Sequence, residues 1–172
     1  MTERQLWVDH IFNLDIHPGW AQNIMSRIED CPLRLSNIIK GLSDYELSKN
    51  IDGAYSIKEH IGHLIDLESL WINRFDQFEK GLPELVHADM SNQKTKEANH
   101  NESNIDNLLE KFKHERDQLI STFKNLSEKA LNHKSLHPRL KVIMQPVDLL
   151  FFVAEHDDHH ITSMKLLANE KD

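Results

Sequence analysis

The sequence predicts an all-α protein with the architecture of an antiparallel four-helix bundle and a long polar loop between its second and third helices. Hydrophobic residues make up 39% of the 172 residues and charged residues 28%, which is typical of a globular chain. The chain has only 5 glycines and 5 prolines, too few for the frequent turns of an all-β fold. Four segments each carry one apolar stripe at helical spacing, and only other helices are available to bury these stripes. We therefore expect one domain over residues 1–172.

The first helical segment is expected from about Gly19 to Leu42. Pro32 should kink it or divide it in two, because proline lacks the amide that a helix interior requires. We expect the indoles of Trp7, Trp20 and Trp71 to belong to the core. The apolar stripe of this segment follows a spacing of about 3.6 residues and comprises Trp20, Ile24, Ile28, Leu35, Ile38, Ile39 and Leu42.

The second helix should start near Ser56, because Ser56 and Glu59 have the spacing of a capping box. It should end near Lys80, where the sequence Gly81-Leu82-Pro83 stops it. The polar segment 84–104 that follows has little helical or strand periodicity, so we expect a long loop. Such a loop either covers a functional site, with Asn92, Lys94, Thr95 or His100 in contact with a substrate, or is simply a solvated connection.

The third helix is expected over about 105–126, and the fourth from Pro146 to about Asn169. Proline suits the first turn of a helix, where its missing amide costs nothing. The stretch 127–145 between them is mixed in composition and has no clear period.

The charge balance and the cysteine content exclude several classes of protein. With 20 Lys and Arg against 28 Asp and Glu, the formal net charge is −8, the wrong sign for binding a nucleic-acid backbone. The longest apolar run, residues 149–154, is far shorter than the roughly 20 residues of a membrane span. The single cysteine, Cys31, cannot form an internal disulfide and is expected to be a buried, inert thiol. We expect a cytoplasmic protein that binds neither nucleic acid nor membrane.

Histidine is the residue type that stands out, with 12 copies in the chain. On the fourth helix His156 and His160 lie one turn apart on the apolar face, whereas His159 lies at its edge and Asp158 is expected to face solvent. Two histidines at this spacing can bind one divalent ion, although each could instead be a core histidine with a hydrogen-bond partner. A third ligand is expected from the second helix, which offers His60 and His63. Helical periodicity does not choose between these two.

Two stretches resemble the DinB-like superfamily of metal-binding four-helix bundles, which includes thiol-dependent transferases. They are 55–68, which contains His60 and His63, and 154–160, which contains the H-x-x-x-H pair. The resemblance implies that His63, His156 and His160 hold a divalent ion such as zinc or nickel, and that His60 and His159 are neighbours of the site. It also makes a homodimer plausible. The chain has Tyr55 where tryptophan is common in that family, a change that should alter packing only.

Two functions remain open. A metal-dependent enzyme would use the coordination position left open by three histidines, as a thiol S-transferase or a hydrolase acting on a small-molecule substrate such as a low-molecular-weight thiol. The alternative is a non-catalytic bundle that binds a metal or small ligand, or dimerises, without turnover. Glu59, Asp66, Glu155 and Asp157 are candidates for orienting the imidazoles or moving a proton, although surface carboxylates are more often simply solvated. A further pair, His137 and Arg139, could bind an anionic group.

Overall fold

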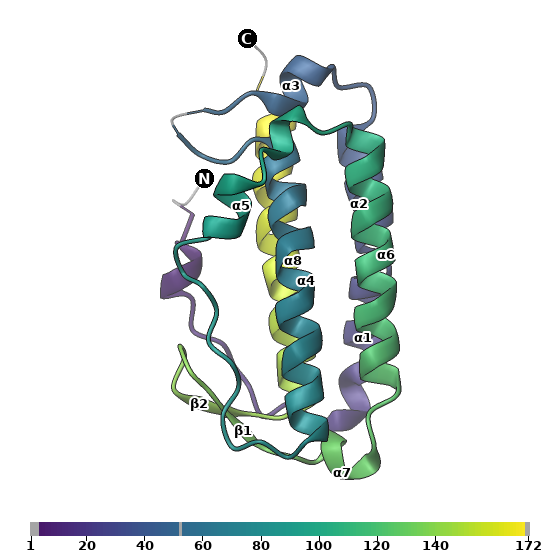
Figure 1. Ribbon diagram of the computed structural model, residues 1–172, viewed down its shortest axis with the longest axis vertical. Helices are drawn as coiled ribbons and strands as arrows, with labels where there is room; N and C mark the ends of the chain where they lie inside the picture. The colour runs from purple at the N-terminus through teal and green to yellow at the C-terminus, as the bar shows by residue number, and fades with distance from the viewer. Residues whose placement is uncertain (1–3, 52, 171–172) are drawn as a thin grey trace.

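The computed structural model describes residues 4–51 and 53–170, and four long helical rods dominate it (Figure 1). The first rod consists of two helices, and the others are one long helix each, so the predicted four-helix bundle is confirmed. In chain order the α-helices are α1 (Ala21–Glu29), α2 (Cys31–Ile39), α3 (Asp44–Ser48), α4 (Ile57–Glu79), α5 (Gln93–Glu97), α6 (Ile105–Lys124), α7 (Glu128–Leu131) and α8 (Pro146–Asn169). Short 3-10 turns lie at Trp7–Asp9, Pro18–Trp20 and His100–Glu102, and the strands are β1 (Ser135–His137) and β2 (Val142–Met144).

The ends of the long helices follow from their local sequence. α2 begins just after Asp30 with Pro32 in its first turn, so proline divides the first rod as expected. At the start of α4 the hydroxyl of Ser56 accepts from the amide of Glu59, and the Glu59 carboxylate accepts from the amide of Ser56. This reciprocal capping box fixes where α4 enters the bundle. Gly81, with a φ of 68°, follows its last turn and allows the chain to leave the helix.

The bundle is not antiparallel throughout, contrary to the sequence-based expectation, because α6 runs parallel to α4. At one end, the side chain of Asn101, just before α6, accepts a hydrogen bond from Ser56, just before α4. At the other, the rings of Phe75 and Phe123 lie 5.4 Å apart. The 23 residues of α4 span about 35 Å, and the connection 84–104 is long enough to return over that distance (Figure 1).

That connection is not uniformly irregular, since it contains α5 and the turn His100–Glu102. The mixed stretch 127–145 likewise contains α7 and a small antiparallel hairpin, in which Leu136 of β1 pairs with Ile143 of β2. An isolated bridge joins Glu84 to Leu136, so the hairpin lies beside the start of the connection. None of these short elements was part of the sequence-based expectation.

The core between the rods contains an ion triad as well as apolar side chains. The guanidinium of Arg116 on α6 contacts the carboxylates of Glu68 on α4 and Asp157 on α8, and all three side chains are buried. Burial raises the pKa of Glu68 and also that of the neighbouring Cys31 thiol, which agrees with an inert cysteine.

Two expected placements were wrong. Asp158 does not simply face solvent, because its carboxylate pairs with Arg27 on α1 and Arg34 on α2, which join the first rod to α8. Trp20 is 58% exposed, because it lies in a 3-10 turn before α1 and not on the helix stripe. No helix among the described residues is long and apolar enough to cross a membrane.

Candidate metal centre

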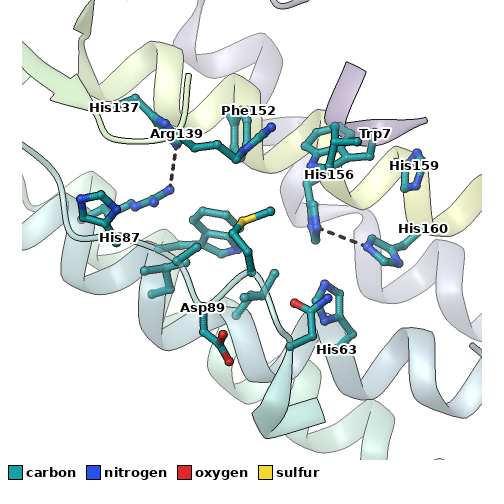
Figure 2. A pocket seen from close by; sticks show the side chains of 18 of the residues that line it. Trp7, His63, His87, Asp89, His137, Arg139, Phe152, His156, His159 and His160 are labelled. Carbon is teal, nitrogen blue, oxygen red and sulfur yellow. Dashed lines mark hydrogen bonds between the residues drawn. The ribbon is translucent and has the colours of Figure 1, made fainter. Parts of the chain in front are cut away.

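Three histidines from two helices meet inside the bundle. His63 on α4 is 5% exposed, and His156 and His160 on α8 are 5% and 7% exposed. One ring nitrogen of each lies within 4.8 Å of those of the other two. The expected residues are therefore adjacent in space although α4 and α8 are far apart in the sequence (Figure 2).

The spacing of these nitrogens fits a common cation. The Nε2 atoms of His156 and His160 lie 3.2 Å apart. Two nitrogens bound to one tetrahedral zinc ion at the usual bond length are separated by about 3.3 Å. The Nδ1 atom of His156 is buried without a hydrogen-bond partner among the described residues, so no protein acceptor fixes the orientation of this ring. The donor set suits zinc, nickel, cobalt or copper, and availability and geometry decide between them.

The electrostatic environment keeps all three imidazoles neutral, which is the form that binds a metal. Burial lowers the pKa of His63 to about 4, with Asp66 opposing the shift and His100 adding to it. Burial also holds the pKa values of His156 and His160 well below the ordinary value, and the neighbouring histidines lower them further.

A hydrogen-bonded chain behind His63 sets the orientation of its ring. The Thr95 hydroxyl on α5 donates to Asp66 at 3.0 Å, so its oxygen is free to accept from the Nδ1 of His63, 3.1 Å away. His100 donates to the same Asp66 carboxylate at 2.9 Å. With its proton on Nδ1, His63 presents the unprotonated Nε2 for coordination. Of the candidate carboxylates, Asp66 is therefore the one that supports the cluster.

Gly62 makes this arrangement possible. A Cβ atom at position 62 would lie 2.2 Å from the ring of His100, far inside van der Waals contact. Because the position has no side chain, His100 can pack directly onto α4 and reach Asp66, one helical turn from Gly62.

His60 is buried beside the cluster but is not one of the three converging residues. Its Nδ1 atom lies 2.7 Å from the Nδ1 of His160, on the opposite side of the His160 ring from the nitrogen that faces His156. Tyr55 packs against the rings of both His60 and His63, with centroids 5.6 Å from each. His60 is thus placed to hold the His160 ring in position.

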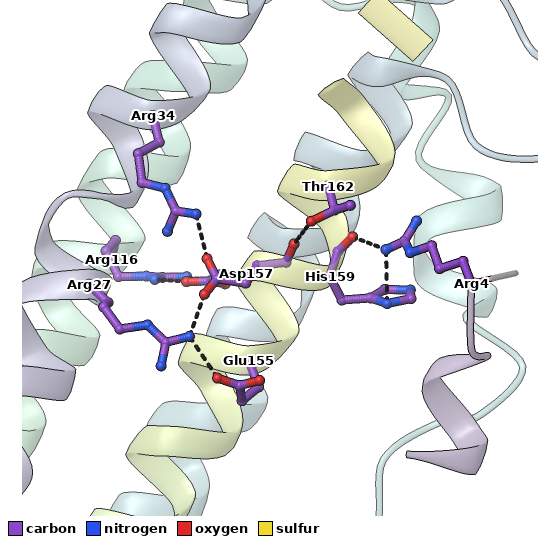
Figure 3. Close-up of polar contacts among 9 residues, drawn as sticks. Arg4, Arg27, Arg34, Arg116, Glu155, Asp157, His159 and Thr162 are labelled. Atoms are coloured by element: carbon purple, nitrogen blue, oxygen red, sulfur yellow. Dashed lines mark hydrogen bonds and ion pairs between the residues drawn. The ribbon is translucent and has the colours of Figure 1, made fainter. Parts of the chain in front are cut away.

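The other candidate residues form contacts outside the three-histidine cluster. His159 contacts Arg4 through its ring and its backbone carbonyl, at the edge of α8 (Figure 3). Glu155 pairs with Arg27, Asp157 with Arg116, and Glu59 serves in the capping box. None of these three carboxylates contacts the three-histidine cluster through a described hydrogen bond.

A cavity of about 290 Å³ opens beside the histidines. Trp7 and Trp71 form its wall next to His156, with ring centroids 5.2 and 5.9 Å from the imidazole. The connection 84–104 contributes residues 87–90 and Asn92 to the lining, and His137 and Arg139 lie at the far end (Figure 2). This volume suits a small molecule.

The sequence alone did not reveal the supporting roles of Thr95, His100 and Gly62. Thr95 and His100 were considered only as substrate contacts, yet both are buried against α4. A signal was present for Gly62, since a glycine in the interior of a helix, between two histidines, is unfavourable unless packing requires it.

Fold and site together define a four-helix-bundle protein with a buried three-histidine cluster at the end of a small cavity. The model of the DinB superfamily matches residues 27–164 of the sequence. The chain therefore belongs to the DinB superfamily, as the sequence resemblance indicated.

Solved structures with the same fold agree with this assignment. YfiT from Bacillus subtilis, described as a probable metal-dependent hydrolase with an unusual four-helix bundle topology, is 17% identical with a TM-score of 0.77, covering 92% of this chain and 91% of YfiT. The mycothiol-dependent maleylpyruvate isomerase is 14% identical with a TM-score of 0.67, covering 84% of this chain and 60% of the isomerase. At these identities the likeness concerns the fold. A search of curated protein sequences finds no significant match.

Proposed function

We propose that this protein is a metal-dependent enzyme, a hydrolase or thiol S-transferase, in which His63, His156 and His160 hold a divalent zinc or nickel ion. The observation that carries the proposal is the convergence of one nitrogen from each residue within 4.8 Å, in a buried position that keeps the imidazoles neutral. Three protein ligands leave a position open in a tetrahedral site, which is typical of catalytic and not of structural zinc.

The cavity supports an enzymatic role for such a site. It is lined by all three histidines, so a small molecule bound there would lie next to the ion. A bound divalent ion would lower the pKa of a coordinated water or thiol and so supply a nucleophile near neutral pH.

Other residues of the chain orient the histidine rings and limit the access of water to them. Asp66 and Thr95 fix the His63 tautomer, and His60 supports His160. Trp7 and Trp71 cover the side of His156 that borders the cavity and limit the access of bulk water. The substrate is expected to enter between these rings and the connection 84–104, because both line the cavity.

Relatives of the fold are consistent with this proposal. YfiT is described as a probable metal-dependent hydrolase, and the isomerase as mycothiol-dependent. We extend metal dependence to this chain because of its own three histidines, and small-molecule chemistry because of its own cavity.

Elemental analysis of protein purified without added metal tests the site directly. We expect about one equivalent of metal in the wild-type protein, loss of that metal in His63→Ala, His156→Ala and His160→Ala, and its retention in His159→Ala. The last variant is a matched control, because it removes an imidazole from the same helix that does not belong to the converging group. Equal retention by all four variants would refute the ligand assignment.

The reaction is tested with activated esters and with electrophiles offered together with low-molecular-weight thiols. The proposal expects product formation that disappears on chelation and returns with the metal. A protein that binds metal stoichiometrically but forms no metal-dependent product would instead be a binding bundle.

A further inference from the structure

The end of the cavity away from the histidines carries two arginines without acidic partners. Arg74 on α4 is 1% exposed, and Arg139 follows β1. Both line the cavity, and among the described residues neither forms an ion pair with a carboxylate. We call these two side chains the arginine end.

A buried guanidinium without a counter-ion is costly, so its surroundings are informative. Arg74 donates two hydrogen bonds to the carbonyl of Val86, at 3.1 and 2.9 Å, and its Nη1 lies 3.1 Å from the Nε2 of His137. These neutral acceptors hold the side chain in place without balancing its charge. Burial and the charge of Arg139 lower the pKa of Arg74 to about 10, so it stays protonated at neutral pH.

Arg139 offers a free donor at the same place. Its Nη2 atom is buried and has no hydrogen-bond partner among the described residues. Its guanidinium lies over the ring of Phe152, 5.9 Å from the centroid. A buried donor left without a partner costs about 1 to 3 kcal/mol, which favours an acceptor supplied by a ligand.

The only carboxylate in the described lining is that of Asp89, which does not neutralise this charge. Asp89 is exposed at the rim and already accepts hydrogen bonds from the Ser91 hydroxyl and from the amides of Ser91 and Gln93. The lining is therefore positively charged in a protein whose formal net charge is −8. Such a contrast selects for an anion inside the cavity.

Aromatic rings connect the two ends of the cavity. The guanidinium of Arg74 lies 5.3 Å from the ring centroid of Trp71, and that ring lies 5.9 Å from His156. Phe152 stands beside Trp71, with ring centroids 5.8 Å apart. A molecule that reaches from the arginine end to the histidines thus passes a short apolar wall.

We propose that the arginine end binds a terminal oxyanion, carboxylate or phosphate, of a small substrate whose short apolar body lies against Trp71 and Phe152. Its reacting group then lies next to His156. This substrate class rests on the proposed function, whereas the oxyanion site itself rests on the two unpaired arginines.

Calorimetric titration of the full chain with matched probes tests this proposal. Hydrocinnamate carries a carboxylate on a short aromatic body, hydrocinnamamide is its neutral analogue, and phenethyl phosphate is the phosphate counterpart. We expect at least one of the two anions to bind about 10- to 100-fold more tightly than the amide. The stronger anion identifies the oxyanion that the site prefers, and equal affinity of the amide and both anions would overturn the proposal.

Two variants locate the binding site. Arg139→Gln should remove most of the preference for the anion and leave the part that Arg74 supplies, whereas Arg139→Lys should keep more of the preference. Lys141→Gln removes the same charge from an exposed position two residues further along and outside the cavity lining, and it should leave binding unchanged. Equal loss in Arg139→Gln and Lys141→Gln would contradict direct binding by Arg139.

The titration is repeated after chelation, because an anion could also bind to the ion. Discrimination that survives chelation and depends on Arg139 supports the oxyanion site, even in a protein that contains no metal. Discrimination that is lost on chelation and is indifferent to Arg139→Gln overturns this inference while leaving the metal centre intact. The two proposals can therefore fail separately.

Discussion

The Nδ1 atom of His60 lies 2.7 Å from the Nδ1 of His160, so the two imidazoles are hydrogen-bonded through the His160 nitrogen that faces away from His156. One of the two must donate, and burial keeps both rings neutral, with the pKa of His60 lowered to about 3. This contact fixes the rotation of the His160 ring and hence the direction in which its Nε2 points.

His60→Ala should weaken metal binding without abolishing it. Loss of a hydrogen-bond partner behind a ligand typically costs about 10- to 100-fold in metal affinity. Competition with a chromophoric chelator measures this change, and His159→Ala serves as the comparison because His159 lies outside the cluster. Unchanged affinity in His60→Ala would show that the contact does not orient His160, and complete loss of metal would make His60 a ligand.

Gly62→Ala should destabilise the protein by about 1 to 3 kcal/mol, because the new Cβ would overlap the ring of His100. The effect should change sign when His100 is removed. In a His100→Ala background the same substitution meets no ring. It replaces a glycine in the helix interior with alanine, which has a higher helix propensity, and should stabilise the fold by up to about 1 kcal/mol. Urea unfolding of the four proteins in this cycle measures the coupling, and an equal cost in both backgrounds would contradict it.

Arg116→Met should cost about 3 to 5 kcal/mol of unfolding free energy at neutral pH. The substitution leaves the carboxylates of Glu68 and Asp157 buried without their shared cation. Glu68→Gln is the matched comparison, since it keeps the shape, and Asp157 still pairs with Arg116. Because the Glu68 Oε2 atom is buried without a described partner, the amide group of the glutamine becomes a buried donor without an acceptor, and we expect a loss of about 1 to 3 kcal/mol, smaller than that of Arg116→Met. Similar losses in the two variants would contradict this account of the triad.

His137 should make the protein less stable as the pH falls. Burial, with the charges of Arg74 and Arg139, lowers its pKa to about 3 from an ordinary value of 6.5. Between these values the unfolded chain binds more protons than the folded one, so this residue removes about 1.4 kcal/mol of stability per pH unit on acidification. Unfolding curves from pH 7 to pH 4 should show a shallower pH dependence in His137→Asn, and an identical slope would contradict a buried neutral His137.

Much of the bundle was predictable because its signals are local. The capping box at Ser56, the proline that divides the first rod, and the bounds of α8 all follow from neighbouring residues. The common direction of His156 and His160 also follows from helical geometry alone. These features are set within one or two turns of helix.

The remaining features depend on contacts between distant segments. Helical periodicity left His60 and His63 as alternatives because it counts only apolar neighbours, and His63 is covered partly by the polar residue Thr95 of α5. α5 in turn has no apolar stripe and is held by contacts such as that of Thr95 with Asp66. The parallel course of α6 is likewise set by the path of a polar connection that carries no periodic signal.

The intrinsic fluorescence of the two indole rings beside His156 should respond to a paramagnetic cation bound at the histidines. Trp7 and Trp71 are in ring contact with this imidazole, whereas Trp20 is exposed to water and distant in sequence from both helices of the cluster. Any paramagnetic cation seated at the histidines would quench the emission of the first two and leave a red-shifted background from the third. Occupancy by a paramagnetic cation can thus be followed in real time by intrinsic fluorescence, with no label attached, whereas diamagnetic zinc would leave the emission of these two indoles unquenched.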